Sequence, residues 1–454
     1  MTARLPSALS RFRRAAALKL RTRVAVLAAL AAATVLACVS PALANAATAP
    51  AANNAAPTWS AVEVQSPHTT YSHPSAGLFA VTCTGTANCV AGGEYINSAG
   101  HEQAMVVSGS RGTWSGARTI ALPHTSYAKS GQGLVNGLTC TSAGNCVAVG
   151  YIGTQMGAAG DGRGFIDAEV RGTWRKALIP AQPARASAKP YGEYNSVACS
   201  GPGACATVGF YLDTLHGVTP AAQTEVGGRW QTATGITLPA NATTGGASFA
   251  ILSSVQCPQS GFCIAVGSYK TTANQIEAMR VTQTGGRWGR AVEVGAPANA
   301  AASPAAALAS ISCATPATCI AVGSYATKGG DTASMVITLA GGQWSATRGI
   351  YTVPSNAAAN SQPALFGISC QPKFCQAVGG YISTSGSRLW MVISEAGGHW
   401  SNPQQIAPPF NAATGAAQQG YPYAVSCSAS AWCSAVGTYI PINAQAQPMG
   451  ATRD

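Results

Sequence analysis

Charged residues are scarce in this sequence: Asp, Glu, Lys and Arg make up 9% of its 454 residues, whereas soluble domains typically contain about 25%. Hydrophobic residues make up 47%, which excludes an intrinsically disordered chain, because such a chain is more charged and less apolar. Histidine is also rare, with six residues, and no Gly-x-Ser-x-Gly, P-loop or HExxH motif occurs. The 14 acidic residues form no recognisable pair of the kind that glycosidases use. The sequence therefore favours no enzyme class.

Acidic residues are absent before Glu63, although seven Lys and Arg residues precede an apolar run at 24–38. A basic segment followed by an apolar run of this length is typical of a secretory signal peptide and is too short to span a membrane. We predict that residues 1–46 are this signal peptide, with cleavage after Ala44 or Ala46. The mature chain is then secreted and has no transmembrane span.

Removal of this leader changes the charge of the protein. The remaining chain has 19 basic and 14 acidic residues, a net charge of +5 instead of +12. The strongly basic character that would suggest a nucleic-acid partner is therefore lost, and we expect no such partner. Residues 47–57 are expected to be a disordered remnant of the leader. Two alternatives stay open: export through a twin-arginine signal at Arg13-Arg14, and a lipid anchor on Cys38.

The cysteines, in contrast, are numerous and periodic. Apart from Cys38, they form seven pairs whose first members recur every 56 to 59 residues. The pairs are Cys83/Cys89, Cys140/Cys146, Cys199/Cys205, Cys257/Cys263, Cys313/Cys319, Cys370/Cys375 and Cys427/Cys433. We predict a disulfide within each pair, because an exported chain favours disulfides and neither the spacing nor any following His fits a zinc site. A catalytic redox pair is the alternative.

Each repeat contains the pattern of four short strands. An alternating apolar run such as 252–256 precedes the first Cys, a second strand such as 263–269 follows the second Cys, and a third strand such as 334–338 ends at a tight turn, usually Gly-Gly. A fourth strand begins with Trp. Every copy has Gly four residues after the second Cys and a small residue three before the first. This period predicts an all-β fold, a seven-bladed β-propeller with four antiparallel strands per blade. Its repeats start near residues 78, 134, 193, 251, 308, 365 and 422.

The tryptophans predict how the ring closes. Each of the other six repeats has a Trp after its Cys pair, but none follows Cys427/Cys433, and Trp59 precedes the first pair. We therefore predict that residues 58–64 form the outer strand of the last blade and pair with 445–451, which hides both ends of the ring. The propeller domain then spans residues 58–454.

The repeat pattern Ser-Cys-x5-Cys-x-Ala-Val-Gly-x-Tyr, followed by Gly-Gly-x-Trp, resembles the repeats of secreted bacterial disulfide-stapled β-propeller proteins, which are distantly sialidase-like and kelch-like in style. The resemblance covers nearly all of the mature chain and implies a fold rather than an activity. Two departures are clear. In 108–114, Ser110 stands where a sialidase aspartate box has Asp, and the Gly-Gly, Tyr and Trp order of kelch blades is not kept.

The longer loops indicate where a ligand would bind. In a propeller with this strand order, the loop between the second and third strands and the link to the next blade lie on one face, and we expect both to be long. Loops on a rigid scaffold commonly carry binding residues, and aromatics among Ser, Asn and Gln suit a sugar or a peptide. The second and third blades hold the most charge. The candidate binding residues are Tyr71, His73, Tyr127, Asp161, Arg163, Tyr191, Glu193, Asp213 and His216.

The alternative is that these tyrosines only cover the tops of the blades and that the charges form a solvated face. We expect a secreted, non-catalytic binding module, a monomer without cofactor or metal, that recognises a glycan, a cell-envelope component or a protein. The second hypothesis is a glycan-active hydrolase or lyase with its site at the mouth of the ring. The third is a purely structural surface protein.

Overall fold

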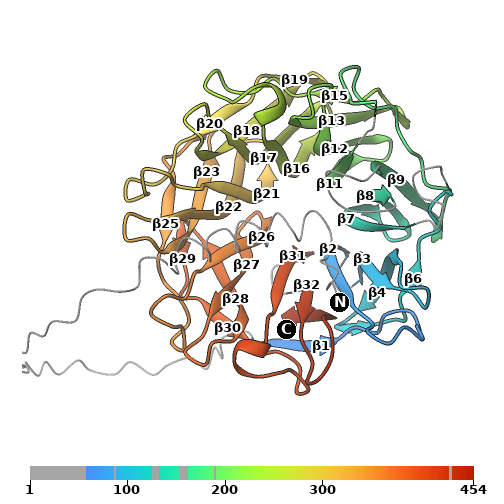
Figure 1. Cartoon of the computed structure of the whole chain (residues 1–454), viewed down its shortest axis with the longest axis vertical. Coiled ribbons are helices and arrows are strands. Elements are labelled where there is room, and N and C mark those ends of the chain that lie inside the picture. Colours follow the sequence, from blue (N-terminus) through green and yellow to red (C-terminus); the bar gives the residue numbers. More distant parts are fainter. Residues whose placement is uncertain are drawn as a thin grey trace, which may run out of the picture. The chain divides into compact units, whose positions relative to one another are not determined.

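The computed structural model describes residues 58–85, 88–124, 132–153, 162–188, 191–428 and 432–453. The predictions for the signal peptide, Cys38 and the leader remnant, and those for Tyr127 and Asp161, concern residues outside these ranges. The chain from Trp59 onward forms a compact unit in which seven antiparallel sheets are arranged around one axis (Figure 1). The prediction of a seven-bladed β-propeller is confirmed.

The sheets follow one another along the chain. The first blade contains β2 (Ala76–Thr84), β3 (Asn88–Ile96), β4 (Glu102–Ser110), β5 (Thr113–Trp114) and β6 (Arg118–Thr119). The second contains β7 (Gly133–Ser142), β8 (Asn145–Gly153), β9 (Gly162–Val170) and β10 (Thr173–Trp174). The third contains β11 (Gly192–Gly201), β12 (Ala204–Leu212), β13 (Val218–Val226), β14 (Arg229–Trp230) and β15 (Thr234–Gly235). The fourth contains β16 (Ala250–Gln259), β17 (Phe262–Lys270), β18 (Ile276–Thr284), β19 (Arg287–Trp288) and β20 (Val292–Val294).

The remaining blades repeat this order. The fifth contains β21 (Ala307–Thr315), β22 (Thr318–Ala326), β23 (Thr332–Ala340), β24 (Gln343–Trp344) and β25 (Arg348–Ile350). The sixth contains β26 (Ala364–Gln371), β27 (Phe374–Ile382), β28 (Arg388–Ala396), β29 (His399–Trp400) and β30 (Gln404–Ile406). The seventh contains β31 (Tyr421–Cys427), β32 (Cys433–Tyr439), β33 (Gln447–Arg453) and β1 (Trp59–Glu63). Two short 3-10 turns, η1 (Gly245–Ala247) and η2 (Gly415–Ala417), lie in links between blades.

The outer strand differs from the prediction in one respect. It is not one continuous strand in most blades but two short pieces that both pair with the third strand, as β19 and β20 do with β18. The first piece leaves the tight turn at the Trp, and the second resumes a few residues later. Only in the seventh blade is the outer strand continuous, because β1 comes from the other end of the chain.

The N-terminal strand closes the ring as predicted, but β1 pairs with residues 449–453 instead of the predicted 445–451. β1 pairs with β33, and Trp59 lies opposite Arg453 while Val62 lies opposite Gly450. Trp59 is half-buried against the hydrophobic cluster of the sixth and seventh blades, the kind of environment that Trp114 and Trp400 have in their own blades. Both ends of the described unit are therefore held in one sheet.

A β-bulge explains the glycine that follows every Cys pair. The register between the first and second strands of the fourth blade shifts by one residue, so that Leu252 faces Gly267 but Ser254 faces Val266. A Cβ on Gly267 would lie 2.0 Å from the carbonyl oxygen of Ile251. The corresponding distance in the seven blades is 1.9 to 2.2 Å. Glycine is thus required there by the close approach of the bulged strand.

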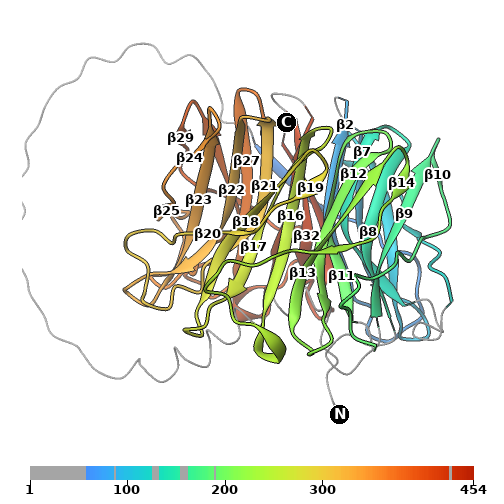
Figure 2. The ribbon, with the colours of Figure 1, turned by 90° about the horizontal axis from the view of Figure 1, so that it is seen from above.

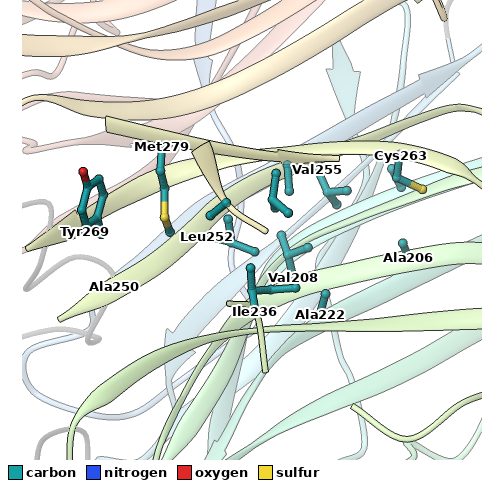
Figure 3. Close-up of a cluster of buried hydrophobic side chains, with 14 of the residues drawn as sticks. Ala206, Val208, Ala222, Ile236, Ala250, Leu252, Val255, Cys263, Tyr269 and Met279 are labelled. Carbon is teal, nitrogen blue, oxygen red and sulfur yellow. The ribbon is translucent and has the colours of Figure 1, made fainter. Parts of the chain in front are cut away.

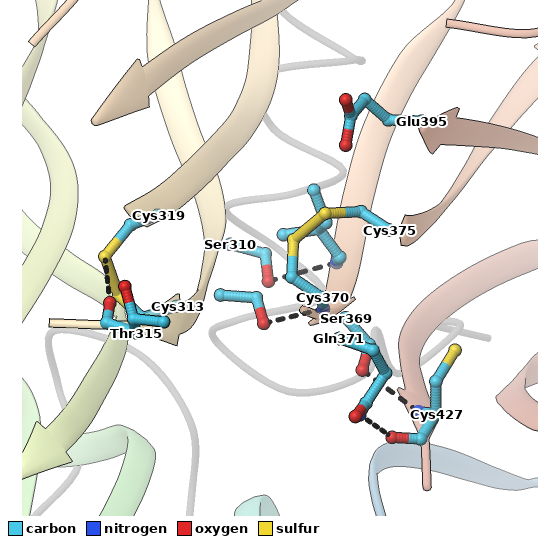
Figure 4. Close-up of a disulfide and its surroundings, with 12 residues drawn as sticks. Ser310, Cys313, Thr315, Cys319, Ser369, Cys370, Gln371, Cys375, Glu395 and Cys427 are labelled. Carbon is cyan, nitrogen blue, oxygen red and sulfur yellow. Dashed lines mark hydrogen bonds between the residues drawn. A yellow bond between two sulfur atoms is a disulfide. The ribbon is translucent and has the colours of Figure 1, made fainter. Parts of the chain in front are cut away.

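The small residues of the innermost strands allow close contact between blades. A Cβ on Gly137 would lie 2.8 Å from the Cα of Ser196 in the next blade. Where the residue is serine, it adds a hydrogen bond: Ser310 Oγ accepts one from the backbone N–H of Ile368, at 3.3 Å (Figure 4). Ser312 and Ser369, which directly precede the first cysteine of their blades, accept the backbone N–H of Cys370 and Cys427, each at 2.9 Å. These bonds join the innermost strands of neighbouring blades and satisfy buried backbone donors.

The hydrophobic core lies between successive blades. In the gap between the third and fourth blades, Val208 and Ala222 pack against Leu252, Val255 and Met279 (Figure 3), and each of the five is buried. Burial of apolar surface of this kind contributes about 25 cal/mol per Å².

The seven predicted disulfides are formed, each within one blade, between its first and second strands. The bridges are Cys83–Cys89, Cys140–Cys146, Cys199–Cys205, Cys257–Cys263, Cys313–Cys319, Cys370–Cys375 and Cys427–Cys433. The second cysteine of every pair is buried, and Cys205, Cys263 and Cys375 are each 4% exposed. A catalytic redox pair needs a sulfur atom that solvent and a partner can reach. In the fourth, sixth and seventh blades both cysteines are buried, so the alternative of a redox site does not fit Cys257/Cys263, Cys370/Cys375 or Cys427/Cys433.

Candidate functional site

Two faces of the ring differ in their loops. The links between blades and the turns between second and third strands meet on one face, called here the link face (Figure 2). In the fifth blade, Ala300 of the link forms a β-bridge with Thr327 of the turn, and the N–H of Lys328 donates to the carbonyl of Asn299. The prediction that both segments share a face is confirmed. The opposite face carries the turn between each pair of cysteines and the Gly-Gly turns, and is called here the cysteine face.

The prediction that both kinds of loop are long is wrong for the turns. In the first, third, fourth, fifth and sixth blades, the segment between second and third strands has five residues, as at 271–275 and 327–331. A hydrogen bond from the N–H of Thr271 to the carbonyl of Gln275 closes such a turn. The links supply the length, as at 351–363 between β25 and β26.

Four consecutive links share a turn that ties them to a buried tyrosine. Residues 239–242, 297–300, 354–357 and 409–412 each read Pro-x-Asn-Ala, and the Ala N–H donates to the Pro carbonyl in each. The Asn side chain accepts a hydrogen bond from the hydroxyl of a tyrosine on the second strand. These tyrosines are Tyr269, Tyr325, Tyr381 and Tyr439, bonded at 2.7 to 3.0 Å. This motif was not predicted from the sequence, although its period matches that of the cysteines.

A hollow on the link face lies between the fifth and sixth blades. Its volume is about 600 Å³, and it is lined by the turn 327–333, by Asn299 and by the link residues 351–363. The prediction from charge favours the second and third blades instead. Two residues of the fifth blade and its link account for the position of the pocket.

One cause of the pocket is Pro363, the residue before β26. In other blades, the residue before the first strand donates a hydrogen bond from its backbone N–H to the preceding blade: Ala306 to the carbonyl of Ile276, and Gly420 to that of Arg388. Pro363 occupies the same position before β26 and has no N–H. The carbonyl of Thr332, at the start of β23, therefore cannot receive this bond from Pro363.

A second cause of the pocket is the last residue of the turn between the second and third strands. In the fourth blade this residue is Gln275, whose side-chain N–H donates to the carbonyl of Ala302 in the next link. In the fifth blade it is Asp331, which is shorter and, when ionised, has no N–H or O–H to donate. Asp331 is exposed at the rim of the pocket. The side-chain bridge that closes the gap after the fourth blade is therefore not available after the fifth.

Tyr351 lines the pocket, and its hydroxyl is bonded to the buried Tyr325. Glu293 in the fourth blade lies opposite Met279, and the equivalent residue opposite Met335 in the fifth is Gly349. A Cβ on Gly349 would lie 2.3 Å from the hydroxyl of Tyr351 and 2.4 Å from that of Tyr325. Without that side chain, the Tyr351 hydroxyl reaches Tyr325 at 2.9 Å and Asn299 at 2.8 Å. The Tyr351 residue stays 57% exposed.

The electrostatics of the pocket are mixed. Burial, together with the hydrogen bond to Tyr351, raises the pKa of Tyr325, so its hydroxyl keeps its proton. Lys328 Nζ donates to the carbonyl of Ala298 at 3.2 Å. Among the lining residues, Asp331 is the single carboxylate. Within the described residues, no group of three or more His, Cys, Asp or Glu side chains could hold a metal ion. The pocket offers an aromatic ring, hydroxyls, amides, one ammonium and one carboxylate.

Of the residues predicted from sequence, Tyr71, His73 and His216 lie exposed on loops, and Asp213 is a buried residue of a turn. Tyr71 and His73 stand in the link before β2, with ring centroids 6.4 Å apart, and Ser72 Oγ lies 2.9 Å from His73 Nδ1. His216 is exposed in the turn 213–217 at a φ of 63°. In the same turn, Asp213 Oδ1 accepts the backbone N–H groups of Leu215 and Gly217, at 2.9 Å each, so this carboxylate shapes the turn.

The other predicted residues, Tyr191, Glu193 and Arg163, are buried or half-buried. Tyr191 is buried, with its ring between those of Tyr151 and Phe210 at 5.8 Å from each centroid. Glu193, on the innermost strand β11, is 1% exposed, and Arg163 at the start of β9 is half-buried. Of the predicted residues that the structure describes, none lines the pocket between the fifth and sixth blades.

The fold places the chain in the class of β-propellers. A scan against models of protein families finds no match, and neither does a search of curated protein sequences. Solved structures do match. A polysaccharide lyase, an ulvan lyase, is 12% identical, with a TM-score of 0.48 over 85% of this chain and 95% of that one. A Hadza microbial sialidase is 11% identical, with a TM-score of 0.43 over 77% and 73%. A six-bladed lectin of Aleuria aurantia that recognises fucose is 12% identical, with a TM-score of 0.41 over 74% and 97%.

Within the described ranges, the chain has no helix of the length and hydrophobicity that a membrane crossing requires.

Proposed function

We propose that this protein is a secreted, non-catalytic, glycan-binding β-propeller that holds a sugar unit in the pocket between the fifth and sixth blades. The observation that carries the proposal is Tyr351, an exposed ring whose hydroxyl is fixed by Tyr325 and Asn299 in the wall of a polar hollow. A sugar has an apolar C–H face that packs on such a ring and hydroxyls that need fixed hydrogen-bond partners. The volume of about 600 Å³ suits one or two sugar rings.

The groups around the ring fit this role. Asp331 and Asn299 offer oxygen acceptors, Gln362 and Lys328 offer N–H donors, and the hydroxyls of Thr327 and Ser361 act as either. Of the residues predicted from sequence, Tyr71, His73 and His216 stand in links or turns and would extend the contact surface around the ring. Seven disulfides fit an oxidising compartment outside the cell. We propose a monomer.

The second candidate function is a hydrolase or a lyase acting on glycans. Hydrolysis by the usual mechanism needs a second carboxylate across the bond from the first, and the pocket lining supplies Asp331 alone. The lining therefore lacks the carboxylate pair that hydrolysis by this mechanism uses.

The test is a binding assay on immobilised polysaccharides and cell-wall preparations that scores both retention of the protein and release of product. We expect retention without release. Tyr351→Ala should lower retention at least tenfold, while Tyr351→Phe, which keeps the ring, should retain most of it. Phe410→Ala is the matched control, because Phe410 is a fully exposed ring on a neighbouring link, outside the pocket. Retention that depends on Phe410 but not on Tyr351, or release of product that Asp331→Asn abolishes, would overturn the proposal.

A further inference from the structure

A second hollow lies on the cysteine face, between the first and second blades. Its volume is about 420 Å³, and its walls include Asn88, Ser110 and Trp114 of the first blade and Cys140 and Glu169 of the second. It is distant in the fold from the link-face pocket, and the proposed glycan site makes no use of it.

An aromatic residue that fills the equivalent space after three other blades is missing at this hollow. The residue before the second cysteine is aromatic in the fourth, sixth and seventh blades, and there it packs into the core of the following blade. These residues are Phe262, Phe374 and Trp432. The first blade has Asn88 at this position, held across the strand pair by a 3.2 Å hydrogen bond from Ser110. The second, third and fifth blades have Asn145, Ala204 and Thr318. The hollow is thus the space that an aromatic ring fills after three other blades.

The filled gaps also show which residue an occupant would meet. On each third strand, one residue lies opposite the second cysteine: Arg453 opposite Cys433, and Glu169 opposite Cys146. The guanidinium of Arg453 lies over the ring of Phe374 in the preceding blade, 5.9 Å from its centroid. By the same geometry, a ring between the first and second blades would lie beside Glu169.

Glu169 determines which kind of aromatic ring the hollow would favour. Its Oε2 is buried without a hydrogen-bond partner, which is a costly state for a carboxylate oxygen. Burial raises the pKa of Glu169, and the charge of Arg118 opposes this. A carboxylate repels the negative face of an aromatic ring but attracts its positive edge, and most strongly an N–H on that edge. The sulfur atoms of Cys89 and Cys140 in the walls are favourable neighbours for a ring.

We propose that this hollow is a binding site for an aromatic ring that carries an N–H donor, the chemistry of an indole, with the N–H donating to Glu169. The ring takes the place that Phe262, Phe374 and Trp432 occupy between later blades. Free indole compounds and an exposed tryptophan of a peptide share this chemistry.

The experiment is a titration of the full-length oxidised protein with indole and with 1-methylindole, followed by calorimetry or ligand-observed NMR at millimolar concentrations. We expect indole to bind about tenfold more tightly, because the methyl group removes the donor to a charged acceptor. An acetylated, amidated Trp tripeptide is titrated in parallel. Binding tighter than that of indole identifies a peptide as the source, and weaker binding identifies a small molecule.

Two variants introduce the residue that another blade has at the equivalent position, so each side chain already occurs in this repeat. Asn88→Phe copies Phe262 and should abolish binding of both indoles. Glu169→Leu copies Leu339 and should remove the preference for indole over 1-methylindole, while the ring itself still binds. Phe262→Asn opens the corresponding gap after the fourth blade, where Leu339 replaces the carboxylate, and should add a site without that preference. No indole binding in the wild type, or binding that Asn88→Phe leaves intact, overturns the proposal.

Discussion

Ser60 and Thr452 lie side by side, with their hydroxyl oxygens 3.5 Å apart, although 392 residues separate them in the chain. The contact belongs to the pairing of β1 with β33, and it is supported on the link face by Glu63, which accepts a 3.0 Å hydrogen bond from the Asn411 side chain and another from the Tyr439 hydroxyl. The seventh blade therefore depends on both ends of the described unit. Closure of this kind removes the exposed strand edge that a linear array of blades would leave.

Removal of β1 is predicted to destabilise the whole ring. Deletion of residues 47–65 exposes the edge of β33 and removes the half-buried Trp59 from its cluster, so the free energy of unfolding should fall by about 3–5 kcal/mol from the combined loss of the ring and of the strand pairing. Deletion of 47–55 leaves β1 intact and should change it by less than about 0.5 kcal/mol. Urea denaturation of both proteins measures the difference. Equal stability of the two would show that β1 does not close the ring.

The seven disulfides are predicted to be fully formed and local. The intact mass of the secreted protein without reductant should be lower by fourteen hydrogens than that of the reduced chain, and peptide mapping should find each bridge within one blade. Replacement of both Cys313 and Cys319 by Ser should lower the free energy of unfolding by roughly 2 kcal/mol, as the loop-entropy model gives for so small a loop. A bridge between blades, or a free thiol in a pair, would contradict this.

Gly267→Ala is predicted to be among the most damaging single substitutions. Its Cβ would overlap the carbonyl oxygen of Ile251, and relief of the overlap must break the bulge between β16 and β17, so a loss of about 3 kcal/mol or more is expected. Gly295→Ala is the matched control, because a Cβ there meets no atom within 4 Å. Thermal unfolding of the two variants gives the comparison. A similar melting temperature for both would remove the steric explanation for the glycine.

The architecture could be predicted because the same local pattern occurs in each of the seven repeats. Cys pairs, alternating strands and the glycine before Tyr269 or Tyr325 all depend on contacts within a blade or with an identical neighbour. Trp59 was informative for the same reason, since it completes a set of seven. The reason for the glycine, in contrast, required the bulge, which shifts the register by a single residue and leaves no periodic signal of its own.

The pocket could not be predicted, because it arises where one repeat departs from the others. Pro363 matters only because Ala306 and Gly420 donate a hydrogen bond from the same position, and Gly349 matters only because Glu293 fills that place in the fourth blade. Alignment of the repeats position by position would have found both differences. Their consequence, an exposed Tyr351 beside a hollow, depends on which side chains face which gap.

Asp167 predicts a pH dependence of stability. This carboxyl on β9 is 1% exposed, and burial raises its pKa from 3.8 to about 7, although the N–H of Ala168 donates a 2.8 Å hydrogen bond to its Oδ1. The folded protein therefore binds the proton more tightly than the unfolded chain, so the stabilisation is complete below pH 4 and is lost as the pH rises to about 7. Urea titrations of the wild type and of Asp167→Asn at several pH values test this. The wild type should lose about 2–4 kcal/mol relative to the variant between pH 4 and pH 8, whereas curves that stay parallel would mean that Asp167 is ionised in the folded protein throughout this range.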